Sequence, residues 1–238
     1  MTTPIVYIKV SKTGSQVILK GLLQKLIDKH GWSWKYHPPH WDMNIPFHIA
    51  FMRKEFMDKD VIIGHYSPRP FQWHRFIYAA CLRKSPIFLG SVREPMKCHI
   101  SNYYYGNRFK DNMTWEEWYT KYSVMKNDQY SLYGYTAVVD FMHNHLSNYL
   151  GFTDINEITE ETVKDRYFWI FRLENFRESV YGFIEKFGMD VEPDLTPDNV
   201  NKVVKRGINN LKQETIDLFK KNNEMDYKLY DIVKNLYK

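Results

Sequence analysis

Long apolar runs are missing from the sequence, and cysteine is scarce. The apolar stretches have only the length of strands, as from Pro86 to Val92, so no segment is expected to cross a bilayer. Two cysteines, Cys81 and Cys98, are too few for a disulfide framework, which favours a reducing compartment. The first residues also lack the basic start and the small-residue cleavage site of a signal peptide. We therefore expect a cytoplasmic protein with no membrane partner.

A strong excess of one charge is missing too. Lysine and arginine number 33 against 28 aspartate and glutamate residues, a formal net charge of +5. This modest excess permits an anionic small ligand, and nucleic acid is not expected as a partner. The hydrophobic share of 44% and the charged share of 26% exclude disordered, collagen-like and disulfide-rich classes. Aromatic residues are plentiful at 17%, which suits both cores and clefts that stack on sugars or bases.

Short apolar runs alternate with longer amphipathic ones, without repeats or Gly- or Ser-rich linkers. This pattern predicts one α/β domain over residues 1–238, with a central, mostly parallel sheet flanked by helices and a helical C-terminal part. Strands are predicted over Ile5–Val10, Ser33–Tyr36, Val61–Gly64, Ile87–Val92 and Tyr167–Phe171. Helices are predicted over Ser15–Lys29, Pro46–Phe56, Pro95–Tyr105, Trp115–Tyr122, Leu132–Tyr149, Asn175–Phe187, Ile208–Lys221 and Asp226–Tyr237.

The loop Ser11–Gln16 joins the first predicted strand directly to a helix. Backbone N–H groups and the helix dipole converge at such a junction, which predicts an anion site. Gly14 lets the backbone approach a ligand closely, Lys12 adds positive charge, and Thr13 and Ser15 add hydroxyls. A nucleotide-hydrolysing P-loop does not fit, because no glycine precedes Lys12. An ordinary βα turn remains the alternative for this loop taken alone.

A second anion site is predicted at the end of the strand Ile87–Val92. Arg93 follows that strand directly, and Ser101 lies on the next helix. Because ligands bind at the carboxyl edge of an open parallel sheet, this site and the loop around Lys12 are expected to be neighbours. Two adjacent pockets indicate one ligand with two separated anionic groups.

These residues resemble a known family. Lys12-Thr-Gly-Ser15 is similar to the 5′-phosphosulfate loop of sulfotransferases, and Arg93-Glu-Pro95 followed by Ser101 is similar to their 3′-phosphate site. The likeness is closest to the carbohydrate branch that contains heparan sulfate 2-O-sulfotransferase. Further similarities, in the expected order along the chain, are Gly64-His65, the run from Pro86 to Tyr105, Glu174-Asn175-Phe176 with Glu178-Ser179, and Asn223-x-x-Asp226-Tyr-x-Leu-Tyr230.

The resemblance implies a P-loop-like sulfotransferase fold and the donor 3′-phosphoadenosine 5′-phosphosulfate (PAPS), without a metal. By this resemblance Lys12 would stabilise the leaving phosphate, and Arg93 and Ser101 would hold the 3′-phosphate. The 5′-phosphosulfate cradle would comprise Thr13, Gly14, Ser15 and Gln16. Gln16 departs from the family pattern, since a hydroxyl residue is usual there. The resemblance also suggests that Lys205, Arg206 and Gly207 close over the nucleotide, with an exposed charged run as the alternative.

Sulfonate transfer needs a group that removes the acceptor's proton, and histidine has a suitable pKa. His65 directly follows the strand Val61–Gly64, and the resemblance makes it the catalytic base; a structural histidine at a strand end is the alternative. His37, His40, His143 and His145 are not expected to bind a metal. Basic and aromatic residues could line a groove for an acidic sugar or could be surface and core residues: Arg69, Arg75, Arg108, Lys110, Trp41, Trp73 and Tyr103.

The sequence thus predicts a PAPS-dependent sulfotransferase whose acceptor is a carbohydrate hydroxyl. A small lipid, a polyketide or another alcohol is the alternative acceptor. Two other classes remain open, an atypical P-loop nucleotide kinase that needs ATP and Mg²⁺, and a non-catalytic module that binds nucleotides or anionic sugars. The oligomeric state is left open.

Overall fold

The computed structural model describes residues 3–37, 59–64, 82, 84–105, 113–123, 143–196 and 211–237. The predicted helix Pro46–Phe56 and most of the predicted helix Leu132–Tyr149 lie outside these residues.

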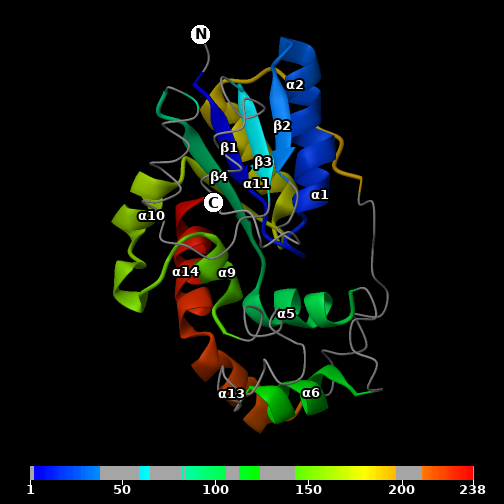
Figure 1. Cartoon of the computed structure of the whole chain (residues 1–238), viewed down its shortest axis with the longest axis vertical. Helices are drawn as coiled ribbons and strands as arrows, with labels where there is room; N and C mark the ends of the chain where they lie inside the picture. Colours follow the sequence, from blue (N-terminus) through cyan, green and yellow to red (C-terminus); the bar gives the residue numbers. More distant parts are fainter. Residues whose placement is uncertain are drawn as a thin grey trace, which may run out of the picture.

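Five strands form one sheet in the order β2-β3-β1-β4-β5, and every neighbouring pair is parallel (Figure 1). The sheet with its flanking helices confirms the predicted α/β class. Strands β3 and β4 have the predicted bounds, while β1 ends two residues early and β2 and β5 are displaced by one or two residues. The strands are β1 (Ile5–Ile8), β2 (Trp34–His37), β3 (Val61–Gly64), β4 (Ile87–Val92) and β5 (Trp169–Arg172).

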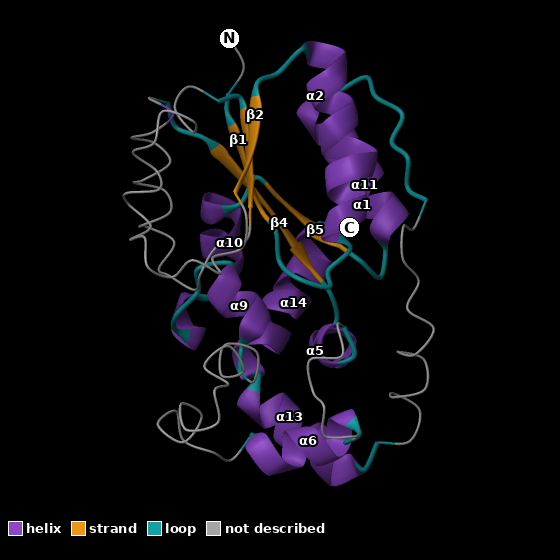
Figure 2. Ribbon diagram, turned by 45° about the vertical axis from the view of Figure 1, so that its right-hand side comes forward, coloured by secondary structure: helices purple, strands orange, loops and turns teal. Residues whose placement is uncertain are grey.

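Helices cover both faces of the sheet. The helix after β1, together with α11 (Phe176–Phe187), lies on one face, and α9 (His145–Tyr149), α10 (Glu160–Arg166) and α14 (Glu224–Leu236) lie on the other (Figure 2). Fully buried residues throughout β1 and β3 fit strands covered on both sides. In the described residues, no helix is both long and apolar enough to span a membrane.

The helix after β1 is not the uniform α-helix that the pattern predicts. It consists of α1 (Ser15–Val17), a wide π-helical stretch at Ile18–Leu23, and α2 (Gln24–His30). The backbone of Asp194 packs against this wide stretch, and its N–H donates to the Gly21 carbonyl at 2.9 Å. A tertiary contact of this kind cannot be read from periodicity. π-helical turns are often found at functional sites, and this one lies directly after the candidate anion loop.

Three further helices lie beyond the carboxyl edge of the sheet: α5 (Pro95–Tyr103), α6 (Trp115–Tyr122) and α13 (Gln213–Asn222) (Figure 1). They share an aromatic cluster that is separate from the main core. Pro95 starts α5, and Thr114 forms with Glu117 the capping box that the sequence Thr114-Trp-Glu-Glu117 predicts. The cluster consists of Met96, Ile100, Tyr103, Trp115, Trp118, Tyr119 and Phe219.

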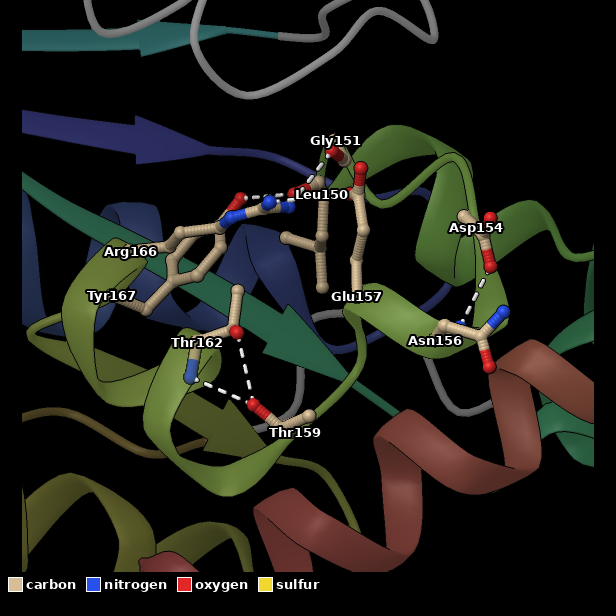
Figure 3. Close-up of polar contacts among 9 residues, drawn as sticks. All are labelled: Leu150, Gly151, Asp154, Asn156, Glu157, Thr159, Thr162, Arg166 and Tyr167. Atoms are coloured by element: carbon tan, nitrogen blue, oxygen red, sulfur yellow. Dashed lines mark hydrogen bonds and ion pairs between the residues drawn. The ribbon is translucent and has the colours of Figure 1, made fainter.

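The helix α10 and the short 3₁₀ turn Ile155–Glu157 before it were not predicted from the sequence. Both are fixed by local polar contacts (Figure 3): Thr159 accepts from the Thr162 N–H at 3.1 Å, and Arg166 binds the Gly151 carbonyl at 3.2 Å and Glu157 at 3.1 Å. Seven residues are too few to show an apolar stripe. The usable signal was the N-cap Thr159 followed by two glutamates in the first turn.

The C-terminal motif that begins at Asn223 joins α14 to α9. Asp226 accepts hydrogen bonds from the N–H groups of Leu146 and Ser147 at 3.0 and 2.8 Å, and Asn223 accepts one from Asn144 at 2.7 Å. Burial raises the pKa of Asp226 to about 6, although the two backbone N–H groups oppose that shift. The motif therefore has a structural role, because it satisfies backbone groups at the start of α9.

Candidate anion site at the carboxyl edge of the sheet

The strand order places a topological switch between β1 and β4. From β1 the chain crosses to β2 on one side of the sheet, and from β4 it crosses to β5 on the other. In open parallel sheets, ligands bind outside the carboxyl ends of the strands at this switch. The residues that follow the two strands include Lys12 and Arg93, so both predicted pockets lie at the same place in the fold.

Two residues of the loop after β1 have a left-handed backbone conformation, which is rare for a lysine and ordinary for a glycine. Lys12 has a φ of 66° and Gly14 a φ of 76°, both in the left-handed region. Gly14 is the N-cap of the helix, and its carbonyl accepts from the N–H of Val17 at 3.0 Å. Within the described residues, no side chain caps this helix start. Its first N–H groups are therefore suited to an anionic ligand.

A chain of buried hydroxyls fastens this loop to β4. Tyr7 donates to Ser91 at 3.1 Å, Ser91 lies 2.6 Å from Thr13, and Thr13 donates to the Val10 carbonyl at 2.9 Å. Because the single hydroxyl hydrogen of Thr13 is donated to Val10, Ser91 is the donor in its hydrogen bond with Thr13. The Thr13 hydroxyl is thus engaged inside the protein, so a contact of Thr13 with a ligand would come from its backbone N–H.

Replacing Thr13 with valine should lower the free energy of unfolding by about 1–3 kcal/mol. The change keeps the side-chain shape but leaves the buried Ser91 hydroxyl without an acceptor and the Val10 carbonyl without its donor. Tyr7→Phe is the matched control, because Ser91 can still donate to Thr13 in that variant. Urea denaturation of both variants measures the difference, and an equal or larger loss for Tyr7→Phe would contradict the proposed direction of the chain.

Two cationic side chains, those of Lys12 and Arg93, belong to this site. The Arg93 guanidinium donates to the Lys12 carbonyl at 3.3 Å, and the Lys12 ammonium lies 3.7 Å from the centre of the Tyr105 ring. Burial lowers the pKa of Lys12, and the positive charge of Arg93 acts in the same direction, while Cys98 opposes it. A negative charge beside Lys12 and Arg93 would stabilise the charged form of the lysine, and an anionic ligand can supply that charge.

The remaining residues predicted to bind the nucleotide differ in exposure. Ser15 and Ser101 are buried, at 5% and 3% exposure, whereas Gln16 is exposed on the first turn of the helix. Ser101 lies on α5, the helix that also carries Cys98, whose thiol lies 3.4 Å from the Ser11 carbonyl. The helix α5 is therefore in direct contact with the loop.

The C-terminal half of the chain supports the end of β4. Glu94 caps α5 by accepting from the Lys97 N–H at 2.7 Å, and it accepts from the Tyr227 hydroxyl of α14 at 3.1 Å. The Glu94 N–H in turn donates to Glu174, which follows β5, at 3.0 Å. Three motifs that are far apart in the sequence thus hold one another in place next to Arg93.

Sequence reasoning missed Lys9, which lies at the same edge. Lys9 is only 4% exposed, and its ammonium donates to the Tyr36 hydroxyl at 3.3 Å. Burial lowers its pKa. Among the described residues the polar side-chain partner of Lys9 is this neutral phenol. A bound anion would therefore stabilise the buried charge of Lys9. The available signal was a lysine placed where a continuous apolar strand ends.

Several predicted site residues lie outside the described part of the chain. These are His65, Lys205, Arg206 and Gly207, and also Arg69, Arg75, Arg108, Lys110, Trp41 and Trp73. Gly64, which precedes His65, is the last residue of β3 and pairs with Ile8 of β1. Tyr103 is buried in the aromatic cluster and donates to the Met113 carbonyl, so it belongs to packing and not to a groove surface.

Comparison of the sequence with family models and with curated proteins finds no match. The fold and the site therefore define the protein as an α/β protein with a five-stranded parallel sheet and a candidate anion site at its topological switch.

Proposed function

We propose that this protein is a sulfotransferase that moves the sulfonate group of PAPS to an acceptor hydroxyl. The observation that carries the proposal is the contact between the two predicted pockets, in which Arg93 donates to the carbonyl of Lys12 at the switch between β1 and β4. A nucleotide with phosphates on both sides of its ribose needs cationic side chains from two neighbouring segments, and this contact makes the loop of Lys12 and the end of β4 neighbours. The strand order and the helix start, which no described side chain caps, further support an anionic donor.

In the proposed reaction the acceptor oxygen attacks sulfur, and the bond from sulfur to the bridging phosphate oxygen breaks. The electron pair of that bond stays on the leaving phosphate, next to the Lys12 ammonium, and the acceptor proton passes to His65. Residues 13–16 bind the 5′ side through backbone N–H groups and the Ser15 hydroxyl, and Arg93 and Ser101 bind the 3′-phosphate. Fixed charges placed where negative charge develops are the main source of rate in group transfers of this kind.

The proposed acceptor is a carbohydrate hydroxyl, and a small lipid or polyketide alcohol is the alternative. The buried ammonium of Lys9 at the same edge favours an acceptor that itself carries negative charge, such as an acidic sugar. Turnover of labelled PAPS against a panel of neutral sugars, acidic sugars and lipid alcohols separates these possibilities.

Thermal shift measurements test the proposal directly. Adenosine 3′,5′-bisphosphate, the product of the donor, should raise the melting temperature of the protein well above the effect of ATP with Mg²⁺. Arg93→Ala should lose this shift, while Arg177→Ala, on the exposed surface of α11, should keep it. His65→Ala should keep the shift and lose turnover.

Each rival class has its own outcome in the same experiment. A larger shift with ATP and Mg²⁺ would identify a nucleotide kinase. A shift with adenosine 3′,5′-bisphosphate that is accompanied by no turnover in the wild type, or by unchanged function in His65→Ala, would identify a binding module.

A further inference from the structure

The Tyr105 ring lies against the one lysine of the anion loop. Its centre is 3.7 Å from the Lys12 ammonium, the distance of a close cation–π contact. Tyr105 follows the end of α5, and its N–H donates to the Asn102 carbonyl at 3.1 Å, which fixes its backbone. The residue is nevertheless 55% exposed, so core packing does not account for its position.

Arg93 and Cys98 also hold the backbone of this loop, and Tyr105 contacts the side chain of Lys12. Arg93 binds the Lys12 carbonyl at 3.3 Å, and the Cys98 thiol lies 3.4 Å from the Ser11 carbonyl. These contacts fix the start of the lysine side chain but leave its four-carbon stem free to rotate. The ring supplies a support for the far end, where the charge is.

A ring face is a support that does not neutralise the lysine. A carboxylate in the same place would consume the positive charge, whereas the ring attracts the ammonium through its quadrupole and leaves N–H donors free on the opposite side. Glu94, the nearest acid to Arg93 in sequence, is engaged with Lys97 and Tyr227. Among the described residues no acid forms an ion pair with Lys12, so its charge remains available to a ligand.

We propose that Tyr105 is a positioning residue. Its ring holds the Lys12 side chain in one conformation, in which the ammonium lies beside the leaving phosphate. This proposal rests on the proposed sulfotransferase function and adds to it a role for Tyr105, to which the resemblance assigns none. Because Lys12 acts most strongly on the charge that develops in the transition state, loss of the ring affects kcat more than KM.

The first measurement concerns the stack itself and needs no ligand. Protons next to the Lys12 nitrogen should show an upfield ring-current shift by NMR in the wild type, which Tyr105→Leu removes and Tyr105→Phe retains. Tyr122→Leu is a matched control, because Lys121 lies over the Tyr122 ring at 5.0 Å on α6. This control should leave the Lys12 signals unchanged. Unshifted Lys12 protons in the wild type would overturn the proposal, whatever the function of the protein.

The second measurement concerns the role of the ring. Tyr105→Leu should lower the affinity for adenosine 3′,5′-bisphosphate by about 2- to 5-fold and kcat by a larger factor, and Tyr105→Phe should restore both. Phenylalanines with increasing fluorination at position 105 should lower log kcat in proportion to the weakened quadrupole, and in a Lys12→Ala background the ring should have no effect.

The results separate the two proposals. A flat fluorination series in an enzyme that turns over PAPS would overturn the role of Tyr105 and leave the sulfotransferase proposal standing. Failure of the wild type to bind adenosine 3′,5′-bisphosphate would overturn the function and, with it, the role assigned to Tyr105, even if the ring-current shift is present.

Discussion

Gly14→Ala is expected to abolish the thermal shift with adenosine 3′,5′-bisphosphate and to lower the free energy of unfolding by about 2–4 kcal/mol. Gly14 has a φ of 76°, where a side chain is strained, and a Cβ there would lie 2.6 Å from Cδ1 of Leu173. The variant must therefore shift either the loop or the residue that follows β5. A rotamer change of Leu173 can relieve this contact, but the strain at this φ remains, and a loop that relaxes the strain displaces the N–H groups at the start of the helix. Urea denaturation and the thermal shift assay measure the two losses.

Gly188→Ala is the matched control, because it separates backbone strain from crowding. Gly188 has a similar φ of 66°, but a Cβ there would meet nothing within 4 Å. Its substitution should cost about 1–2 kcal/mol and should leave ligand binding intact. If Gly14→Ala were no worse than Gly188→Ala and kept the ligand shift, the close packing of the loop on Leu173 would be irrelevant to the site.

Gly21→Ala should lower the free energy of unfolding by about 2–3 kcal/mol, although alanine normally favours a helix. A Cβ at Gly21 would lie 1.8 Å from the carbonyl oxygen of Asp194, a backbone atom that cannot rotate away. The variant must therefore move the segment 191–196 off the helix and break the 2.9 Å hydrogen bond from the Asp194 N–H to the Gly21 carbonyl. Faster hydrogen exchange at the Asp194 amide measures this loss of contact.

Lys20→Ala provides the control for Gly21→Ala, because Lys20 is the exposed neighbour in the same π-helical stretch. It should change the free energy of unfolding by no more than about 0.5 kcal/mol and should leave the Asp194 amide protected. Unchanged exchange in Gly21→Ala would show that the helix and the segment 191–196 pack differently in solution.

Local patterns were sufficient for the elements with strong signals. The unbroken apolar runs of β3 and β4 and the capping box at Thr114 are properties of a few adjacent residues, and the structure has them where they were predicted. The helix α10 was missed because its signal is a cap and not a periodicity. The wide turn at Gly21 was missed because it is accompanied by a contact with Asp194, about 170 residues further along the chain.

The candidate site, too, could be predicted only in part from local patterns. That Lys12 and Arg93 each follow a strand could be read from the sequence, and parallel strands end at one edge. That β1 and β4 are neighbours, and that Arg93 reaches the Lys12 carbonyl, depended on the strand order.

By itself, the sequence determined the α/β class, the bounds of β3 and β4, and the positive charges that follow β1 and β4, because strand and cap signals are local. Only the tertiary structure decided that the Thr13 hydroxyl is used internally, that Lys9 is buried at the same edge, and that the Tyr105 ring supports Lys12. These contacts join residues between 3 and 93 positions apart, as Thr13 with Val10 and Lys12 with Tyr105. The side-chain directions that make them follow from how the loop after β1 packs against β4 and α5, which no local pattern encodes.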